Sequence, residues 1–243
     1  MEPTRKANRI AEVVAAIPID CPHGQLQERL AGFFTELRRS LPREREVVER
    51  AVGALAERRE AVRALLDAYA GLASERFGGR LEILQVLGAL RREDAFEGLA
   101  NIAWKALPPS PARVRCVQVT PRAREETIQS KAVQGIAYLR SERAFAEAER
   151  IMREHESVAV RVEAIDAWMW NKGDADDAAA RLYSLLPPQY HPYVERPRFH
   201  RGMDAARFEE RMLAWMRRWA PKGKLPANPR FLDAGPSHAA AKS

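Results

Sequence analysis

The sequence predicts an all-α protein in which antiparallel helix pairs stack into an α-solenoid, and three observations lead to this prediction. One pattern, an apolar helix, a short charged turn and a second apolar helix, occurs at 81–105, 130–153 and 160–185. The motif Leu-Arg-x-Glu-x-Ala-Phe at 90–96 returns at 139–145. Strand-like composition is confined to 113–121. Because one such pair cannot bury its apolar face alone, neighbouring pairs are expected to stack.

Residues 1–77 are expected to form N-terminal helices that include one long helix. A first helix is predicted from Gln25 to Ser40, and Pro42 then occupies a first-turn position, where proline is tolerated. The long helix should continue to about Ala73, because apolar residues recur at steps of three and four. Its apolar stripe either packs under the preceding antiparallel helix, as a long N-terminal helical hairpin, or forms the seam of a coiled-coil dimer.

Residues 78–188 hold the predicted repeats, and Gly78-Gly79 is interpreted as the break that ends the long helix. In the first pair, these apolar residues are predicted to face the core: Ile83, Leu84, Leu87, Leu90, Phe96, Leu99, Ile102 and Ala103. Two more pairs are expected at 125–154 and 157–186, with Ser157 and Asp174 as N-caps.

An extended insert at 108–124, bounded by prolines, separates the first pair from the second. Its arm, Arg113 to Thr120, is expected to brace two repeats. Addition to the edge of a partner's sheet is the alternative role.

The chain changes in composition after Leu186. Residues 189–220 combine an aromatic, proline-rich stretch with a last amphipathic helix, predicted from Met203 to Trp219. The prolines argue against a helix at 187–200, and the aromatic residues indicate that this stretch packs against the end of the repeats. The last helix is expected to cap the repeats by covering their open apolar face. Residues 221–243, rich in Pro, Gly, Ala and Lys, are expected to form a disordered tail.

Composition narrows the class of protein. A chain of 243 residues with 46% apolar and 30% charged residues is ordinary for a globular protein and can bury a substantial core. The formal net charge is +7, and charge spread over many helix faces favours solubility before phosphate binding. Cys21 and Cys116 lie far apart, which argues against a disulfide framework. Without an apolar run of membrane-spanning length or a signal-peptide core, a cytoplasmic protein is predicted.

The third repeat carries a recognisable set of positions: Val160-Arg161, Ala164, Ala167, Gly173-Asp174 and Leu182. This set resembles HEAT-type repeats, in particular the short bacterial kind also found in phycobilisome-lyase-like proteins, and the other two repeats fit it more loosely. The resemblance implies stacked helix pairs whose second helices line the concave side. It also implies a protein-binding scaffold, since lyase and DNA-repair members are rarer and none of their motifs transfers to this chain.

The predicted contact surface for a protein or peptide partner lies on the second helices. Its candidate residues are Asn101, Lys105, Glu147, Arg150, Glu154 and Arg181. Trp170 is added because Trp168 and Trp170 are two apart on one helix, so they point in different directions and cannot both be in the core. The outward one is expected to be covered by the segment at 190–199 or, alternatively, to be exposed as an anchor for a partner. The mixed signs of these charges suit a protein partner better than a polyphosphate.

The alternative is a nucleic-acid-binding HEAT-like protein that uses arginine clusters on phosphates. The candidate contacts with phosphate or an acidic partner are Arg113, Arg115, Arg122, Arg124, Arg196, Arg198 and Arg201. This alternative requires the fold to bring these arginines onto one face. Three other charged residues, Arg161, Asp166 and Asp174, are expected to join neighbouring repeats through side-chain hydrogen bonds and caps.

No catalytic, cofactor or metal site is predicted. Cys21-Pro22-His23 offers two metal ligands, but zinc sites need three or four. The sequence has no glycine-rich phosphate loop and no nucleophile elbow. An enzyme of the lyase-like kind would need a pocket lined by convergent polar groups. The sequence therefore favours a non-catalytic scaffold over nucleic-acid binding, and both over catalysis.

Overall fold

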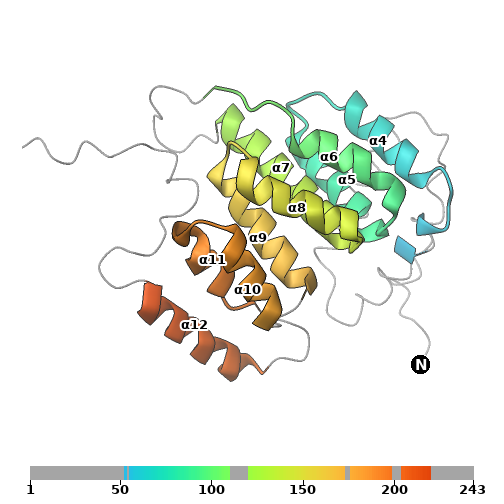
Figure 1. Ribbon diagram of the computed structural model, residues 1–243. Helices are drawn as coiled ribbons and strands as arrows, with labels where there is room; N and C mark the ends of the chain where they lie inside the picture. The colour runs from blue at the N-terminus through green and yellow to red at the C-terminus, as the bar shows by residue number, and fades with distance from the viewer. Residues whose placement is uncertain (1–51, 54, 110–119, 173–175, 199–203, 220–243) are drawn as a thin grey trace, which may run out of the picture.

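A computed structural model describes residues 52–53, 55–109, 120–172, 176–198 and 204–219 (Figure 1). Every regular element in these ranges is a helix, which confirms the all-α prediction. Several predicted features lie outside the described residues: the helix at 25–40, Cys21-Pro22-His23, Cys116, the arm at 113–119 with Arg113 and Arg115, the N-cap Asp174, His200, Arg201 and the tail at 221–243.

The described elements follow one another in this order: α4 (Ala61–Gly71), α5 (Phe77–Leu90), the 3₁₀ turn η2 (Glu93–Ala95), α6 (Phe96–Ala103), α7 (Pro121–Leu139), α8 (Glu142–Glu154), α9 (Val158–Lys172), α10 (Asp176–Leu185), the 3₁₀ turn η3 (Pro188–Tyr190), α11 (His191–Glu195) and α12 (Ala205–Trp219). The pairs α5–α6, α7–α8 and α9–α10 correspond to the three sequence repeats.

Local sequence explains where the paired helices begin. The hydroxyl of Thr120 accepts the backbone N–H of Ala123 at 3.1 Å, with Pro121 in the first turn of α7. Ser157, predicted as an N-cap, accepts the N–H of Val160 at 3.4 Å at the start of α9. Helix α7 thus begins one turn before the predicted start at 125, because the cap and the proline at 120–121 already set the helical path.

The repeated Leu-Arg motif marks where α5 and α7 end. Arg91 and Arg140 adopt left-handed backbone conformations, with φ of 52° and 60°. Their N–H groups bond back to the carbonyls of Gly88 and Ala137, which closes each helix. The sequence similarity of the two repeats therefore reflects one local geometry, in which an arginine occupies a position that glycine usually takes.

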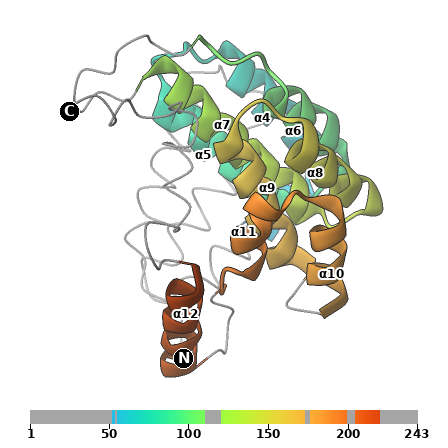
Figure 2. The same ribbon diagram turned by 60° about the vertical axis from the view of Figure 1, so that its left-hand side comes forward.

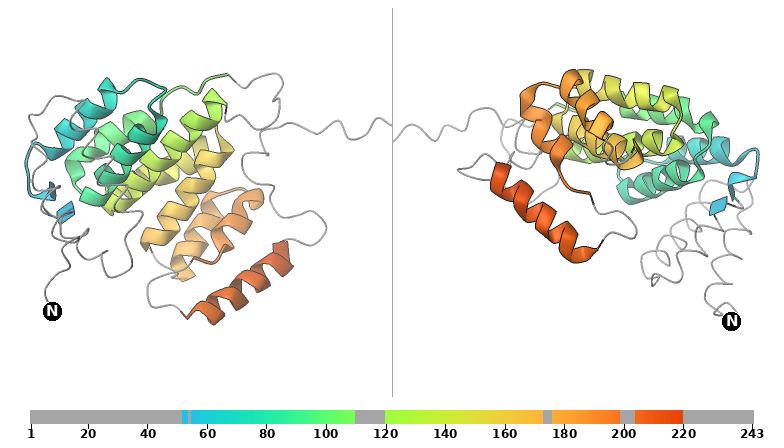
Figure 3. Two further views of the ribbon diagram at one scale, coloured as in Figure 1. Left: turned by 180° about the vertical axis from the view of Figure 1, so that it is seen from behind. Right: turned by 60° about the horizontal axis from the view of Figure 1, so that its bottom comes forward.

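The first helices of the pairs, α5, α7 and α9, pack side by side (Figure 3, left). Gly88 of α5 lies directly against Gly135 of α7: a Cβ atom at Gly88 would be 2.9 Å from the Cα of Gly135. The eight core residues predicted for the first pair are all buried. One continuous apolar core then extends from Leu55 to Val194. Small residues thus let the backbones of α5 and α7 approach closely.

Long side chains link the second helices to one another. Arg143 of α8 lies over the ring of Phe96 of α6, with its guanidinium carbon 3.9 Å from the ring centroid, and pairs with Glu97. Arg181 of α10 binds Glu149 of α8 through two hydrogen bonds of 2.6 and 2.8 Å. The α6, α8 and α10 side of the fold is therefore bridged by polar side chains, whereas α5 and α7 also meet backbone to backbone, at Gly88 and Gly135.

The prediction of one long helix up to Ala73 is wrong within the described residues. A turn at 57–60 separates the short helical stretch before it from α4, which ends at Gly71. The side chain of Arg92 donates hydrogen bonds to the carbonyls of Ala56, Arg58 and Arg59. These three backbone carbonyls at the turn therefore have a hydrogen-bond donor. The break placed at Gly78-Gly79 is also wrong, since both glycines lie in the first turn of α5.

The proline-rich stretch after Leu186 forms helix where none was predicted. Pro188 begins η3, and Pro192 lies in the first turn of α11. A proline at the start of a helix costs little, because the N–H it lacks would have had no partner within the helix. Tyr190, Tyr193 and Val194 are buried, and α11 packs on α9 and α10. The stretch is packed against the helix pairs, as predicted.

Helix α12 lies beyond the paired helices (Figure 2) and contacts the rest of the fold through Trp215, Arg218 and Trp219. The indole N–H of Trp215 donates to the carbonyl of Pro192 at 2.8 Å, and that of Trp219 donates to Glu195 at 2.9 Å. None of the described α12 side chains is buried, and Leu213 and Met216 are exposed. None of the described α12 side chains belongs to the apolar core, so capping of the repeats by this helix stays a prediction. None of the described helices is long and apolar enough to span a membrane.

Candidate binding groove

A groove of about 440 Å³ crosses the outer faces of the first helices. Its lining comes from α5, α7 and α9 and from the segment after α11: Leu81, Glu82, Gln85, Ala123, Glu126, Thr127, Ser130, Lys131, Gln134, Ala159, Val162, Glu163, Asp166 and Arg196. On each helix these residues recur at steps of three and four, so they share one face. We call this surface the first-helix groove.

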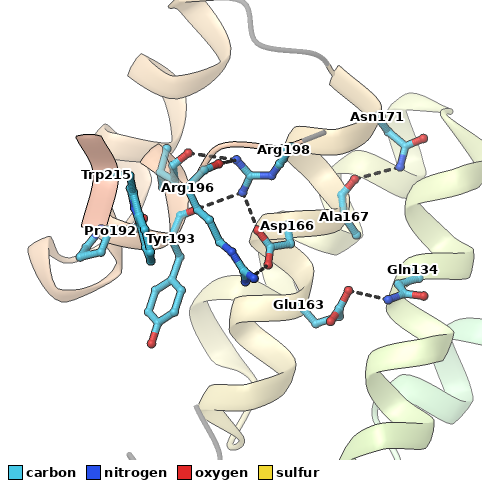
Figure 4. Close-up of polar contacts among 11 residues, drawn as sticks. Gln134, Glu163, Asp166, Ala167, Asn171, Pro192, Tyr193, Arg196, Arg198 and Trp215 are labelled. Carbon is cyan, nitrogen blue, oxygen red and sulfur yellow. Dashed lines mark hydrogen bonds and ion pairs between the residues drawn. The ribbon is translucent and has the colours of Figure 1, made fainter. Parts of the chain in front are cut away.

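A chain of hydrogen bonds runs across the first-helix groove between α7 and α9. The ammonium of Lys131 donates to the amide oxygen of Gln134 at 2.9 Å. The amide nitrogen of Gln134 in turn donates to a carboxylate oxygen of Glu163 at 2.6 Å (Figure 4). Gln134 thus bonds a cation through one amide atom and an anion through the other, and the two charges are not in direct contact within 4.0 Å.

Burial shifts the titration of both charged groups in this chain. It raises the pKa of Glu163 above its ordinary value, and the neighbouring carboxylate of Asp166 raises it further, against the hydrogen bond from Gln134. Burial lowers the pKa of Lys131, although the charge of Glu163 opposes this change. The groove therefore holds a carboxylate and an ammonium that are partly removed from water without pairing with each other.

Asp166 joins α9 to the segment after α11 at one end of the groove. Its two oxygens bind Arg198 at 2.7 Å and Arg196 at 3.3 Å (Figure 4). Arg198 is buried and also donates to the carbonyls of Tyr193, Val194 and Arg196. Asp166 was expected to join neighbouring repeats, whereas its partners in the structure are residues of the segment after α11.

Three of the four described arginines that were predicted to contact phosphate, namely Arg122, Arg196 and Arg198, pair with acidic residues. Arg122 pairs with Glu126 at 3.2 Å, and its guanidinium donates to the carbonyl of Pro108. Arg124 is exposed on α7. Arg196 lines the first-helix groove together with Ala123, so the groups at 122–124 and 196–198 do border one groove. The groove between them carries four carboxylates, from Glu82, Glu126, Glu163 and Asp166, which opposes a phosphate track.

A second cavity, of about 610 Å³, lies where α12 meets α10 and α11. Four arginines line it: Arg196, Arg198, Arg211 and Arg218. Glu195 binds three donors beside this cavity, namely the hydroxyl of Tyr183 at 3.0 Å, the indole of Trp219 at 2.9 Å and Arg218 at 3.0 Å. Burial, with the hydrogen bond to Glu195, raises the pKa of Tyr183 to about 12. These contacts hold α12 in place.

Most residues predicted to contact a partner on the second helices make contacts within the protein. The ammonium of Lys105 lies 3.3 Å from the buried carboxylate of Glu125. Glu147 accepts the indole N–H of Trp104 at 2.5 Å and pairs with Arg150, which lies over the same indole ring. A third cavity, of about 420 Å³, is bordered by α8, α9 and α10, and the paired residues Glu149 and Arg181 line it.

Six of the seven predicted contact residues are exposed, and Glu147 is half-buried. Asn101 and Glu154 are exposed, and Glu154 has only a 3.9 Å pair with Arg153. Trp168 is buried, with its ring edge-on to Phe145, while 42% of Trp170 is exposed. The prediction that the two tryptophans are not both in the core is confirmed.

A buried polar cluster lies apart from the groove, between α4, α5 and α7. Arg80 donates to the hydroxyl of Tyr69 at 2.5 Å and lies 3.7 Å from Glu125. Burial raises the pKa of Tyr69. These contacts join α4, α5 and α7, and none of the three cavities described above is lined by Tyr69, Arg80 or Glu125.

The described residues contain no group of three His, Cys, Asp or Glu side chains that could hold a metal ion. Comparisons with protein families, curated proteins and solved structures found no match for this chain. The groove must therefore be interpreted from its own chemistry.

Sequence reasoning missed Lys131, Gln134 and Glu163. Each is an ordinary polar residue on a first helix, where the HEAT-like pattern directs attention to the second helices instead. One signal was present: α7 carries polar residues around more than one face, which is unusual for a helix with only one solvent-exposed side. The partner of Gln134 on α9 is 29 positions away and depends on how the helices pack.

Proposed function

We propose that this protein is a non-catalytic scaffold, a HEAT-like solenoid of stacked helix pairs, that binds a segment of another protein in the first-helix groove. The groove itself is the observation that carries this proposal. It crosses three helices, and its lining combines apolar groups such as Leu81 and Val162 with amide, hydroxyl, ammonium and carboxylate groups. An extended peptide offers matching main-chain donors, main-chain acceptors and side chains at that scale.

Charge pairing favours this function over nucleic-acid binding. Arg122, Arg196 and Arg198 are bonded to Glu126 or Asp166, so binding a phosphate would require breaking those pairs. A protein segment does not require this, because the groove already presents both signs of charge.

A matched pair of substitutions tests the location of binding. Dodecapeptides are selected from an unbiased displayed library against the full chain, and their affinity is measured by fluorescence anisotropy. Ala159→Trp fills the first-helix groove, and Ala146→Trp places the same side chain on the exposed surface of α8 beside the third cavity. We expect Ala159→Trp to weaken binding at least about tenfold, equivalent to roughly 1.4 kcal/mol, and Ala146→Trp to leave it unchanged.

Other outcomes contradict the proposal. Loss of binding with Ala146→Trp alone would place the site on the second helices. A fluorescein-labelled 20-base-pair DNA duplex provides the contrast with nucleic acid. If the duplex binds with a steep dependence on salt while no peptide is selected, the protein is a nucleic-acid-binding one.

A further inference from the structure

Glu163 differs from two other groove carboxylates in having no cationic partner. Glu126 pairs with Arg122, and Asp166 pairs with Arg196 and Arg198. Among the described residues, no cation lies within ion-pair distance of Glu163, and its one hydrogen bond comes from the neutral amide of Gln134 through a single oxygen. The other carboxylate oxygen accepts no hydrogen bond from the described part of the chain.

Lys131 is close in sequence to Gln134 but does not neutralise Glu163. Its ammonium is bonded to the oxygen of the Gln134 amide, which lies between the two charges. Asp166, three residues after Glu163 on α9, raises the pKa of Glu163, whereas the charges of Lys131 and Arg196 lower it. A cation that enters the groove would stabilise this partly buried carboxylate, because it adds a Coulombic attraction that the neutral amide of Gln134 does not supply.

We propose that the first-helix groove binds a basic side chain, Lys or Arg, of the partner segment, with Glu163 as its ion-pairing residue. This inference rests on the proposed function of the groove. Apolar lining from Leu81, Ala123 and Val162 suits the methylene stem of such a side chain, while its charged end reaches the free oxygen of Glu163. A guanidinium fits best, because its fork of donors can bond that oxygen and a neighbouring acceptor together.

The experiment compares three labelled dodecapeptides that differ only in charge: alternating Arg-Ala, alternating Lys-Ala, and alternating citrulline-Ala, in which a neutral urea replaces the guanidinium. Affinity for the full chain is measured by fluorescence anisotropy at physiological salt. We expect the Arg and Lys peptides to bind at least about tenfold more tightly than the citrulline peptide. The net charge of +7 on the protein works against this result, so nonspecific attraction would not produce it.

Two isosteric variants assign the effect. Glu163→Gln removes the charge but keeps an oxygen that accepts from Gln134, and it should reduce the preference for Arg over citrulline to less than about twofold. Glu209→Gln removes the same charge from an exposed position on α12, outside the groove, and should leave the preference intact. A circular dichroism melt of each variant shows that it is folded, so a lost preference is not a lost fold.

The outcomes separate this inference from the proposed function. If the three peptides bind equally, or if Glu163→Gln keeps the preference, the proposal that Glu163 binds a basic side chain is wrong. The groove would still be a peptide-binding site if Ala159→Trp blocks the library peptides. If the labelled peptides do not bind but library peptides do, the same conclusion holds. If no library peptide depends on Ala159, the proposed function fails, and this inference fails with it.

Discussion

Substituting Gly88 by alanine tests the close contact between α5 and α7. The added methyl would lie 2.9 Å from the Cα of Gly135 and 3.3 Å from the ring of Tyr138, whereas ordinary contacts are 3.4–4 Å. The backbones must separate by several tenths of an ångström, and overpacking of this kind costs about 1–3 kcal/mol. Alanine returns about 1 kcal/mol through helix propensity. The net expectation is a loss of about 1 kcal/mol, at most about 2 kcal/mol.

Gly78 provides the control on the same helix. A methyl there meets nothing within 4 Å, so Gly78→Ala should be neutral or stabilise the fold by up to about 1 kcal/mol. Urea unfolding followed by far-ultraviolet circular dichroism compares the two variants. If Gly88→Ala is as stable as Gly78→Ala, the two backbones are not in contact and the account of how α5 and α7 pack is wrong.

Three further predictions concern single residues. Arg91→Gly relieves a left-handed conformation and should stabilise the fold by up to about 1 kcal/mol in urea unfolding. Burial lowers the pKa of His155, whose ring bonds the carbonyl of Ala103, so the free energy of unfolding should fall as pH drops below about 6.5. His155→Gln should remove this pH-dependent part of the free energy of unfolding. Urea midpoints measured at neutral and acidic pH would show the difference. Asp166→Asn leaves buried Arg198 without its counter-charge and should cost about 3 kcal/mol or more, whereas an unchanged melting temperature would show that the pair contributes little.

The sign of the His155 prediction follows from its neutral folded form. One ring nitrogen accepts the N–H of Ser157 at 3.0 Å, so the other carries the proton and donates to Ala103. The nearby charges are Glu156, which opposes the shift, and Arg161, which adds to it. At a pH above the pKa of His155 in the unfolded chain, the imidazole is neutral in both the folded and the unfolded state, and its full contribution to the free energy of unfolding is present. As pH falls towards the lowered folded pKa, the unfolded state takes up the proton first, so stability is lost.

Periodicity was sufficient to predict which residues of the first pair are buried, because a 3.6-residue repeat places Ile83, Leu87 and Leu90 on one face whatever their partners are. Caps were predictable where the sequence signal is local, as at Ser157. Both kinds of prediction depend only on residues within one or two turns of each other.

The groove was not predictable in the same way. The site forms only because α7 and α9 lie side by side, which brings together Lys131, Gln134 and Glu163. The sequence positions of these three residues do not indicate that their helices are neighbours. The second-helix residues failed to stand out as a free surface for a related reason. Glu147, for example, meets the indole of Trp104 from a helix 43 positions earlier. Side-chain partners between repeats are set by helix spacing, which no single helix encodes.

The helix contacts differ on the two sides of the fold, and this difference should determine how the protein bends. Gly88 and Gly135 are in direct backbone contact, so α5 and α7 cannot approach each other more closely at this point. On the opposite side, Arg143 and Glu97 are exposed, and water readily replaces such a pair. The molecule should therefore bend by spreading α6 from α8, pivoting about the glycine contact. Bending of this kind would change the outline of the protein while leaving the distance between α5 and α7 nearly constant.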